Sequence, residues 1–365
     1  MSNLPKVLFI IPSVDSGGIE IYLLRFLRLK KGEFNAAILV RGSKSGDLAQ
    51  DYKSLMLPLV FMPLGYHNPI RWIKYFHFFK SNEFETICDF NANFSGIPML
   101  IARIAGIKNR IVFYRQGKDH FNSSMPKRLY NSLMNKLVFK NSTKILSNSI
   151  AGLNYFFPNR SANDTRFKVI YNGVNFSDYQ VKINKAELKN NLGIPENGFV
   201  IGHTGRLDKA KNHETILKVA KTLIENDSSI YLVLGGHDTE KLAPIVEESG
   251  ITSNVRLLGY RSDIPALLQM FDVFYFPSIT EGQPNSLLEA MASGLTVIAS
   301  NIEPIAEVFP DKSMLFDPME IEKVVAKIIQ IKSNGIEFLY SDFTEYIALN
   351  FDSEARFNDL LLELN

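Results

Sequence analysis

The chain has 365 residues, of which 46% are hydrophobic and 21% charged, enough for two α/β domains with separate cores. A single cysteine, Cys88, excludes an internal disulfide and suits a reducing compartment. We find no signal-peptide pattern and no apolar run near the ~18 residues of a membrane span. We therefore expect a cytoplasmic protein, peripheral on the inner face of the cytoplasmic membrane if it meets a membrane at all.

The net charge of +2 hides an asymmetry between the two halves. Residues 1–180 contain 24 Lys and Arg against 11 Asp and Glu, which gives +13, and residues 181–365 contain 16 against 27, which gives −11. The difference indicates that the first half meets an anionic partner, either a membrane surface or a phosphate-bearing substrate. Solvated helix faces are the simpler alternative. No nucleic-acid-binding module accompanies the charge, so we expect no nucleic acid as partner.

Short apolar runs alternate with helix-length segments along the whole chain. Helices are predicted near 20–30, 98–105, 214–225 and 286–293. The predicted strands are 7–11, 36–40, 86–88, 110–114, 144–147, 167–170, 199–204, 230–234, 255–258, 273–276, 296–299 and 313–316. Continuous Val, Ile and Leu runs are typical of parallel strands buried on both faces. The pattern predicts an α/β protein with two doubly wound parallel sheets of about six strands each.

A domain boundary is predicted near the Asn172-Gly173 turn, because the charge balance changes sign just beyond it. We expect a first domain over residues 1–177 and a second over residues 178–342.

The segment from Glu281 to Gly294 follows the predicted strand 273–276 and contains a helix start. Amides at a helix N-terminus form an anion site. Glu289, about one turn into the helix, can accept hydrogen bonds from a ribose diol, and Glu281 can reach a sugar beyond the phosphates. An ordinary capped surface helix is the alternative. Pro284, Asn285 or Ser286 can cap the helix, and together with Gln283 these residues are candidates for binding the donor.

A second candidate segment, residues 205–213, follows the strand 199–204. Arg206 and Lys211 can converge on a diphosphate, Arg as a bidentate fork and Lys as a point charge. Gly205 lets the backbone approach a ligand closely. Neither Gly-x-Gly-x-x-Gly nor a phosphate-loop motif occurs here, so a dinucleotide site is not predicted.

Between the first strand and the first helix lies a glycine pair, Gly17-Gly18, that can also bring backbone amides close to a ligand, although a tight turn would serve as well. The chain contains no Asp-x-Asp and no Cys/His cluster with metal-ligand spacing. We therefore expect a metal-independent reaction without a cofactor.

These motifs resemble the retaining family 4 glycosyltransferases of the glycosyl group 1 set, of the bacterial surface-polysaccharide type, which have the GT-B fold. The resemblance runs from end to end and is most specific over residues 199–300. Its features are Gly17-Gly18, the segment 169–175, Gly205-Arg206 through Lys211-Asn212, Leu258-Gly259-Tyr260, and Glu281 and Glu289 followed by Ala290, Ala292 and Gly294.

The resemblance implies a nucleoside-diphosphate sugar held mainly by the second domain. In this assignment Arg206 and Lys211 bind the diphosphate, Glu289 binds the ribose and Glu281 contacts the donor sugar. Gly259, Tyr260 and Arg261 would lie near the base, while Gly17 and Gly18 would close over the phosphates. It also implies that a helix at about 343–365 crosses back to the first domain.

One segment departs from the family pattern. Relatives often have a histidine just after the strand equivalent to 111–114, where this chain has Arg115 and Gln116, and His120 follows later. These three residues are the acceptor-side candidates.

The resemblance favours transfer of a hexose-type sugar, with retention, from a nucleotide sugar to a glycan or lipid-linked acceptor of a cell-surface polysaccharide. The alternatives are a nucleotide-sugar 2-epimerase on the same fold and a catalytically silent nucleotide-sugar-binding partner. Two segments combine aromatic or aliphatic residues with basic ones, 70–80 and 126–140. Either could touch an anionic membrane surface, although each also suits a helix packed on the sheet.

Overall fold

The computed structural model describes residues 4–42, 45–65, 68–118, 125–334 and 340–365. The chain divides into two compact units, a first unit of Met1–Tyr171 with Ala355–Asn365 and a second unit of Asn172–Glu354.

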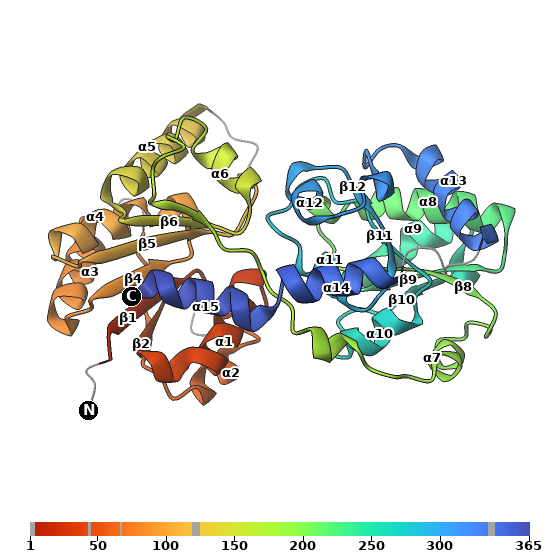
Figure 1. Ribbon diagram of the computed structural model, residues 1–365, viewed down its shortest axis with the longest axis horizontal. Coiled ribbons are helices and arrows are strands. Elements are labelled where there is room, and N and C mark those ends of the chain that lie inside the picture. The colour runs from red at the N-terminus through yellow and green to blue at the C-terminus, as the bar shows by residue number, and fades with distance from the viewer. Residues whose placement is uncertain (1–3, 43–44, 66–67, 119–124, 335–339) are drawn as a thin grey trace. The chain divides into compact units, whose positions relative to one another are not determined.

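The first unit is built on a parallel sheet in the order β3-β2-β1-β4-β5-β6-β7 (Figure 1). Each strand is a short run of mostly apolar residues, which is why the inner strands are buried on both faces. The strands are β1 (Lys6–Ile11), β2 (Asn35–Val40), β3 (Leu59–Phe61), β4 (Thr86–Asp89), β5 (Asn109–Tyr114), β6 (Lys144–Ser147) and β7 (Phe167–Val169).

Alternate residues of β1 lead to two separate cores. Phe9 and Ile11 pack on one face with α1 (Gly18–Lys30), α2 (Ala49–Ser54) and α15 (Ser353–Leu364). Leu8 and Ile10 pack on the other face with α3 (Pro69–Asn82), α4 (Gly96–Ile104), α5 (Met125–Asn141) and α6 (Ile150–Phe156). The period of two along the strand thus places one helix layer on each face of the sheet.

The second unit repeats this plan with a parallel sheet in the order β10-β9-β8-β11-β12-β13. Its strands are β8 (Phe199–Thr204), β9 (Ile230–Gly235), β10 (Val255–Leu257), β11 (Val273–Phe276), β12 (Thr296–Ser300) and β13 (Leu315–Phe316). Its helices are α7 (Lys185–Asn191), α8 (His213–Asn226), α9 (Ala243–Glu248), α10 (Ile264–Met270), α11 (Asn285–Ala292), α12 (Glu303–Val308), α13 (Ile321–Asn334) and α14 (Tyr340–Asn350).

The prediction of two parallel, doubly wound sheets is confirmed, and three details differ. Strand β3 was not predicted, because it is a half-buried edge strand of three residues after Pro58. Only Leu315 and Phe316 of the predicted strand 313–316 are extended, since residues 312–314 form a 3-10 turn. The first unit ends at Tyr171 rather than at 177, because Asn172 is held inside the second unit.

The tail forms two helices where the sequence predicted one. Val174 interrupts it, because its N–H donates to the carbonyl of Phe351 (2.8 Å) and its carbonyl accepts from the N–H of Ser353 (3.1 Å). Helix α14 contacts α11 in the second unit, whereas α15 covers the first sheet. The predicted return of the chain to the first domain is therefore made by α15.

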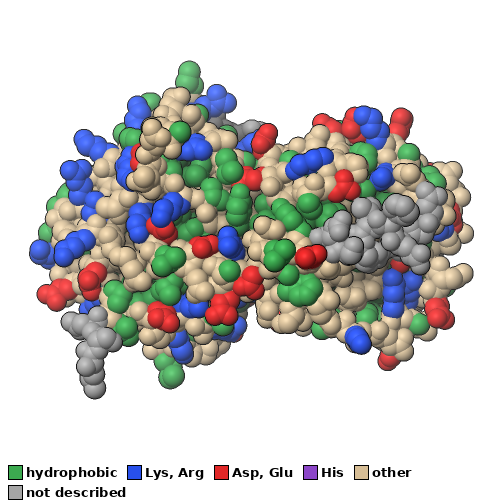
Figure 2. All heavy atoms as spheres, in the orientation of Figure 1, with side chains coloured by type: hydrophobic (Ala, Val, Ile, Leu, Met, Phe, Trp, Pro, Cys, Tyr) green, Lys and Arg blue, Asp and Glu red, His purple; other side chains and the backbone are tan. Residues whose placement is uncertain are grey.

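None of the helices in the described parts of the chain combines the length and apolar character needed to span a bilayer. Figure 2 shows Lys and Arg side chains gathered over the part of the first unit where α3, α4 and α5 lie.

Candidate active site

Both sheets reverse their strand order at one point, between β1 and β4 in the first unit and between β8 and β11 in the second. In open parallel sheets, ligands bind beyond the carboxyl ends of the strands at such a switch point. The loops that follow β8 and β11 contain Lys211 and Glu281.

The structure brings Lys211 and Glu281 together as an ion pair. Lys211 Nζ lies 2.6 Å from Glu281 Oε1, and the two side chains are only 18% and 12% exposed. The ammonium also lies 4.8 Å from the centroid of the Phe276 ring. Backbone contact joins the two loops, because the N–H of Ile279 donates to the carbonyl of Ala210 (2.9 Å). A shielded cation and a shielded anion therefore meet at the switch point.

Arg206 lies in the same loop as Lys211 but is 64% exposed, and its nearest acidic partner is Asp208 at 3.7 Å. Gly205, just before Arg206, has little room for a side chain. A Cβ at Gly205 would lie 3.0 Å from His203 Nε2 and 3.5 Å from the Lys211 side chain. The glycine thus leaves room for the Lys211 stem, while the guanidinium of Arg206 stands in solvent.

The loop that leads into α11 is fixed by Asn172. This asparagine is 2% exposed, and its side-chain amide donates to the Gln283 carbonyl (2.7 Å) and to Asn285 Oδ1 (2.8 Å). Its backbone N–H donates to Gln283 Oε1. Helix α11 begins after Pro284, which has no side-chain group to cap it. No side chain caps its first amides, and the anion site expected there stays a prediction.

Besides Asn285, two residues of α11 belong to the sequence prediction. Ser286 lies in the first turn, and Glu289 is the fifth residue of the helix. Both are partly buried.

An exposed aromatic face stands at the carboxyl end of β10. Tyr260 is 62% exposed and stacks on His237 with ring centroids 4.5 Å apart. Gly259 precedes it with φ +62°, and a Cβ there would lie 1.8 Å from Glu240 Oε1. Arg261 is paired with Asp263 through two hydrogen bonds of 2.8 and 2.6 Å. The arrangement can offer a flat ring to a planar ligand, while Arg261 is already engaged.

Two buried histidines near Lys211, His203 and His213, were not predicted from the sequence. The rings of His203 and His213 lie 5.2 Å apart, and His203 Nδ1 is 2.9 Å from the carbonyl oxygen of Tyr275. Burial lowers the pKa of both, so both are neutral near pH 7. The histidine within the mostly apolar strand 199–204 was the sequence feature that could have predicted a buried histidine here.

In the first unit, Gly17 precedes α1 and lies against the carboxylate of Glu20. A Cβ at Gly17 would lie 2.4 Å from Glu20 Oε2, whereas one at Gly18 would meet nothing within 4 Å. Ser13 Oγ donates to Glu20 Oε1 (3.1 Å), and burial raises the pKa of Glu20. The glycine pair therefore shares its site with an acid that the sequence reasoning did not consider.

The acceptor-side candidates are separated by the structure. Arg115 is partly buried, with its guanidinium carbon 3.6 Å from the centroid of the Tyr22 ring, and desolvation lowers its pKa to about 10. Gln116 follows it and is partly exposed. His120 lies outside the described residues. The guanidinium of Arg115 thus packs on aromatic rings of the first unit.

Asp89 ends β4, at the switch point of the first unit, and was also missed. It is fully buried, and its Oδ1 accepts from the N–H (2.9 Å) and side-chain amide (2.7 Å) of Asn91. Burial raises the pKa of Asp89, and the nearby Arg41 opposes the shift. An acid at the end of a buried strand was the signal for it.

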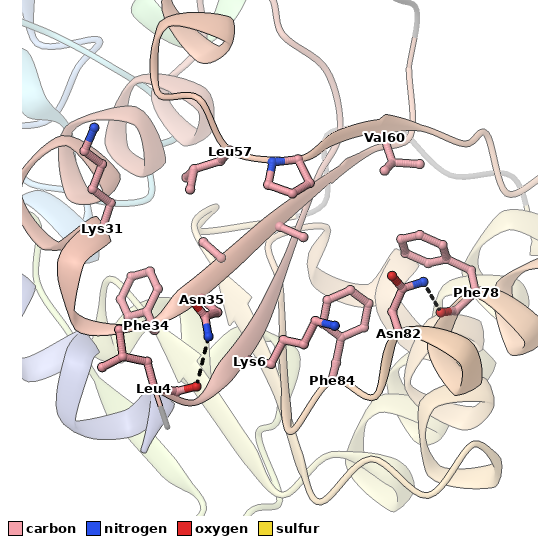
Figure 3. A pocket seen from close by; sticks show the side chains of 13 residues that line it. Leu4, Lys6, Lys31, Phe34, Asn35, Leu57, Val60, Phe78, Asn82 and Phe84 are labelled. Atoms are coloured by element: carbon pink, nitrogen blue, oxygen red, sulfur yellow. Dashed lines mark hydrogen bonds between the residues drawn. The ribbon is translucent and has the colours of Figure 1, made fainter. Parts of the chain in front are cut away.

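Two hollows lie within the separate units. One of about 440 Å³ is at the amino-terminal ends of β1 and β2, lined by Lys6, Asn35 and Phe84 among others, away from the switch point (Figure 3). The other, about 820 Å³, lies between α8, α9 and the loop after β8, and Asp208 and Ile279 line it. The second hollow therefore borders the loops of Lys211 and Glu281.

Residues 184–348 match the family model of the glycosyl transferases group 1. The capsular polysaccharide biosynthesis glycosyltransferase CapH of Staphylococcus aureus is 27% identical over 348 residues, covering 90% of this chain and 92% of CapH. A putative glycosyltransferase of Bacillus subtilis, EpsF, is 27% identical over 82% of this chain and 80% of its own length. The chain is a glycosyltransferase.

The structural comparison gives this glycosyltransferase its fold name. Anabaena Alr3699/HepE, solved in complex with UDP and glucose, superposes with a TM-score of 0.82 over 99% of both chains, at 20% identity. TarM superposes with a TM-score of 0.78 over 100% of this chain and 99% of its own, at 12% identity. The two parallel-sheet units form the GT-B fold.

Proposed function

We propose that this glycosyltransferase moves a sugar from a nucleoside-diphosphate sugar to a glycan or lipid-linked acceptor during synthesis of a bacterial surface polysaccharide. The names of similar proteins support the setting. CapH is described as a capsular polysaccharide enzyme. An Escherichia coli enzyme that is 38% identical over 38% of this chain and 37% of its own length is named a UDP-Gal:alpha-D-GlcNAc-diphosphoundecaprenol galactosyltransferase.

The observation that carries the proposal is the Lys211–Glu281 ion pair at the switch point of the second unit, in the loops that lead to α8 and α11. Negative charge develops on the departing diphosphate in the transition state. A cation and helix amides placed there in advance stabilise that charge. In this proposal Lys211, Arg206 and the first amides of α11 bind the diphosphate.

Glu281 has a second role in the proposal. Its carboxylate holds the Lys211 ammonium at 2.6 Å, and its remaining lone pairs accept hydrogen bonds from hydroxyls of the donor sugar. Glu289 of α11 accepts from the ribose, and the exposed Tyr260 ring stacks on the base.

The chemical step in the proposal is a front-side transfer with retention. The bond between the anomeric carbon and the diphosphate oxygen breaks, and the electron pair leaves with the diphosphate. The acceptor oxygen bonds to the same face of the anomeric carbon, and its proton passes to the departing phosphate oxygen. Because Lys211, Arg206 and the α11 amides supply the positive charge, the proposal needs no metal ion.

The test is nucleoside-diphosphate release from a panel of nucleotide sugars, in EDTA, with and without a bacterial membrane lipid extract. We expect one donor to be used, faster with the extract, with activity lost in Glu281→Ala and kept in Glu248→Ala, an exposed glutamate of the same unit. The anomeric proton coupling of the product reports retention.

Three results would contradict the proposal. An altered nucleotide sugar formed without acceptor would indicate a 2-epimerase. Nucleotide-sugar binding without release from any donor would indicate a silent binding partner. Release that requires a divalent cation would remove the metal-independent mechanism.

A further inference from the structure

Helices α3, α4 and α5 form one layer on a single face of the first sheet. Helix α4 contacts both α3 and α5, and the inward sides of all three pack into one core. Tyr75 and Phe79 of α3, Met99 of α4 and Val138 of α5 lie in that core. The opposite sides of these helices form the outer face of the layer.

The charge of this layer has one sign. The three helices contain no Asp or Glu, and their basic residues are Arg71, Lys74, Lys80, Arg103, Lys127, Arg128, Lys136 and Lys140. The helices on the other face of the same sheet have acids, including Glu20 in α1, Asp51 in α2 and Asp359 in α15. The basic excess of the first half is therefore concentrated on one of its two faces.

Large aliphatic side chains stand among these basic groups instead of packing in the core. Those that are more than half exposed are Ile70 and Ile73 of α3, Ile104 of α4, and Met125, Leu129 and Leu133 of α5. On α5, Lys136 and Lys140 lie seven residues after Leu129 and Leu133, and all four are exposed. A spacing of two helical turns places each lysine in line with a leucine.

We propose that the outer face of α3, α4 and α5 binds the surface of an anionic lipid bilayer. A helix face that combines exposed aliphatic residues with Lys and Arg binds at the boundary between headgroups and acyl chains. The lysines attract the anionic headgroups, and the aliphatic side chains leave water for the acyl region. A soluble polyanion would engage the lysines but would leave Leu129 and Leu133 in water.

Bilayer binding places no requirement on the transfer reaction, so this inference can fail separately from the proposed function. Bilayer binding also explains why six aliphatic side chains are exposed on helices whose inner sides already pack into a hydrophobic core.

The experiment is co-sedimentation of the full chain with vesicles of phosphatidylcholine alone or mixed with phosphatidylglycerol. We expect binding only to the mixed vesicles. The variants Lys136→Glu/Lys140→Glu and Leu129→Ser/Leu133→Ser are each expected to bind at least about tenfold more weakly. Because all four side chains are exposed, the variants are expected to melt as the wild type does.

Matched controls lie on the opposite face of the unit. Leu29→Ser/Leu362→Ser replaces leucines that are 60% and 71% exposed in α1 and α15, and Lys31→Glu/Lys53→Glu reverses two exposed lysines near α1 and α2. Both controls are expected to bind mixed vesicles as the wild type does. Controls that lose binding to the same degree would overturn the assignment of this face.

Two further results would overturn the proposal. One is unchanged vesicle binding in Leu129→Ser/Leu133→Ser, which would indicate a site for a soluble polyanion. The other is equal binding to phosphatidylcholine vesicles, which would remove the role of the lysines. Nucleoside-diphosphate release by the same variants in the absence of vesicles should match the wild type.

Discussion

Lys211 and Glu281 are shielded enough from water that each depends on the other for a favourable partner. Removing one of two paired, buried charges leaves the other unpaired and costs up to ~3–5 kcal/mol, less where water still reaches the site. The ion pair therefore has a structural role that any test of catalysis must separate from a chemical one.

We predict that Lys211→Ala lowers nucleoside-diphosphate release about a hundredfold or more, because it removes a charge placed at the leaving diphosphate. The melting temperature should fall as well. The double variant Lys211→Met/Glu281→Gln should recover stability, since neither side chain is then charged, but not activity. Recovery of activity in the double variant would show that the pair is structural only.

The buried histidines predict a pH dependence of stability. The folded-state pKa of His203 is far below its ordinary value, because burial excludes the charged form. Below the ordinary histidine pKa of about 6.5, the unfolded chain binds protons that the folded chain does not. The free energy of unfolding should therefore fall as the pH is lowered through that value.

In His203→Gln the slope of stability against pH between about 7 and 5 should decrease without vanishing, because His213 still contributes. Denaturant unfolding at a series of pH values measures the slope. An unchanged slope in His203→Gln would mean that folding does not lower the pKa of His203.

At the residue scale, the sequence identified candidate site residues but not the residues that they contact. Lys211 and Glu281 were both assigned to the site, but 70 positions separate them, and only the sheet topology shows that they meet. Asn172 was interpreted as part of a turn, because its partners Gln283 and Asn285 are more than 110 positions away. Such long-range hydrogen bonds leave no local pattern.

At the scale of elements, the loops after β8, β9 and β10 pack backbone against backbone. The N–H of Gly236 donates to the carbonyl of Gly259 (2.7 Å), and the N–H of Gly205 donates to that of Gly235 (2.8 Å). Gly259 therefore sets the position of Tyr260 relative to the neighbouring loops.

Gly259→Ala should displace the loop, because the residue has a left-handed φ of +62° and its Cβ would overlap Glu240. We predict a rise in the KM for the nucleotide sugar and a clear loss of stability. Gly250→Ala is the matched control, with φ +73° and no atom within 4 Å of the new Cβ. It should cost only the ~1–2 kcal/mol of backbone strain and leave KM unchanged. Equal KM values in the two variants would remove Tyr260 from the donor site.

The strands were predictable where they are apolar and buried on both faces, as β1, β2, β8 and β9 are. Strand β3 was missed and strand β13 was predicted too long, because both are short and only half-buried. The break between α14 and α15 also escaped prediction. It depends on Val174, a residue far earlier in the chain.

At the scale of the whole molecule, two segments far apart in the chain belong to the first unit, Met1–Tyr171 and Ala355–Asn365. Phe357 of α15 packs on the rings of Tyr22 and Phe26 at 5.3 and 5.7 Å, and Leu360 and Leu364 lie in the same core. Glu363 forms ion pairs with Lys144 and Lys168 at the end of this helix.

We expect the ionised carboxylate of Glu363 to stabilise the folded protein, and we expect this stabilisation to be lost at acid pH. Burial alone would raise its pKa, but the hydrogen bonds from Lys168 and Lys144 outweigh this effect and lower the pKa. The contribution is present above the ordinary glutamate pKa of about 4.3 and is lost as the pH falls through the lower folded value. Glu363→Gln should be less stable than the wild type at pH 7, and in denaturant titrations the difference should shrink as the pH falls below about 4.3. A constant difference at every pH would assign the effect to packing instead.

The charge asymmetry between the two halves could be predicted from the sequence, but the position of the basic residues on one helix layer could not. Composition showed a basic first half, whereas only the packing of α3, α4 and α5 shows that one helix layer has no acids.

The return of α15 to the first sheet has a consequence for biosynthesis. All residues of the second unit, 172–354, precede Ala355–Asn365 in the chain, so that unit can fold on the ribosome while the first still lacks one of its covering helices. Until α15 is translated, the aromatic cluster of Tyr22 and Phe26 has no cover from Phe357. The unit that begins first is thus completed last, and its nascent form is the one that most needs protection by chaperones.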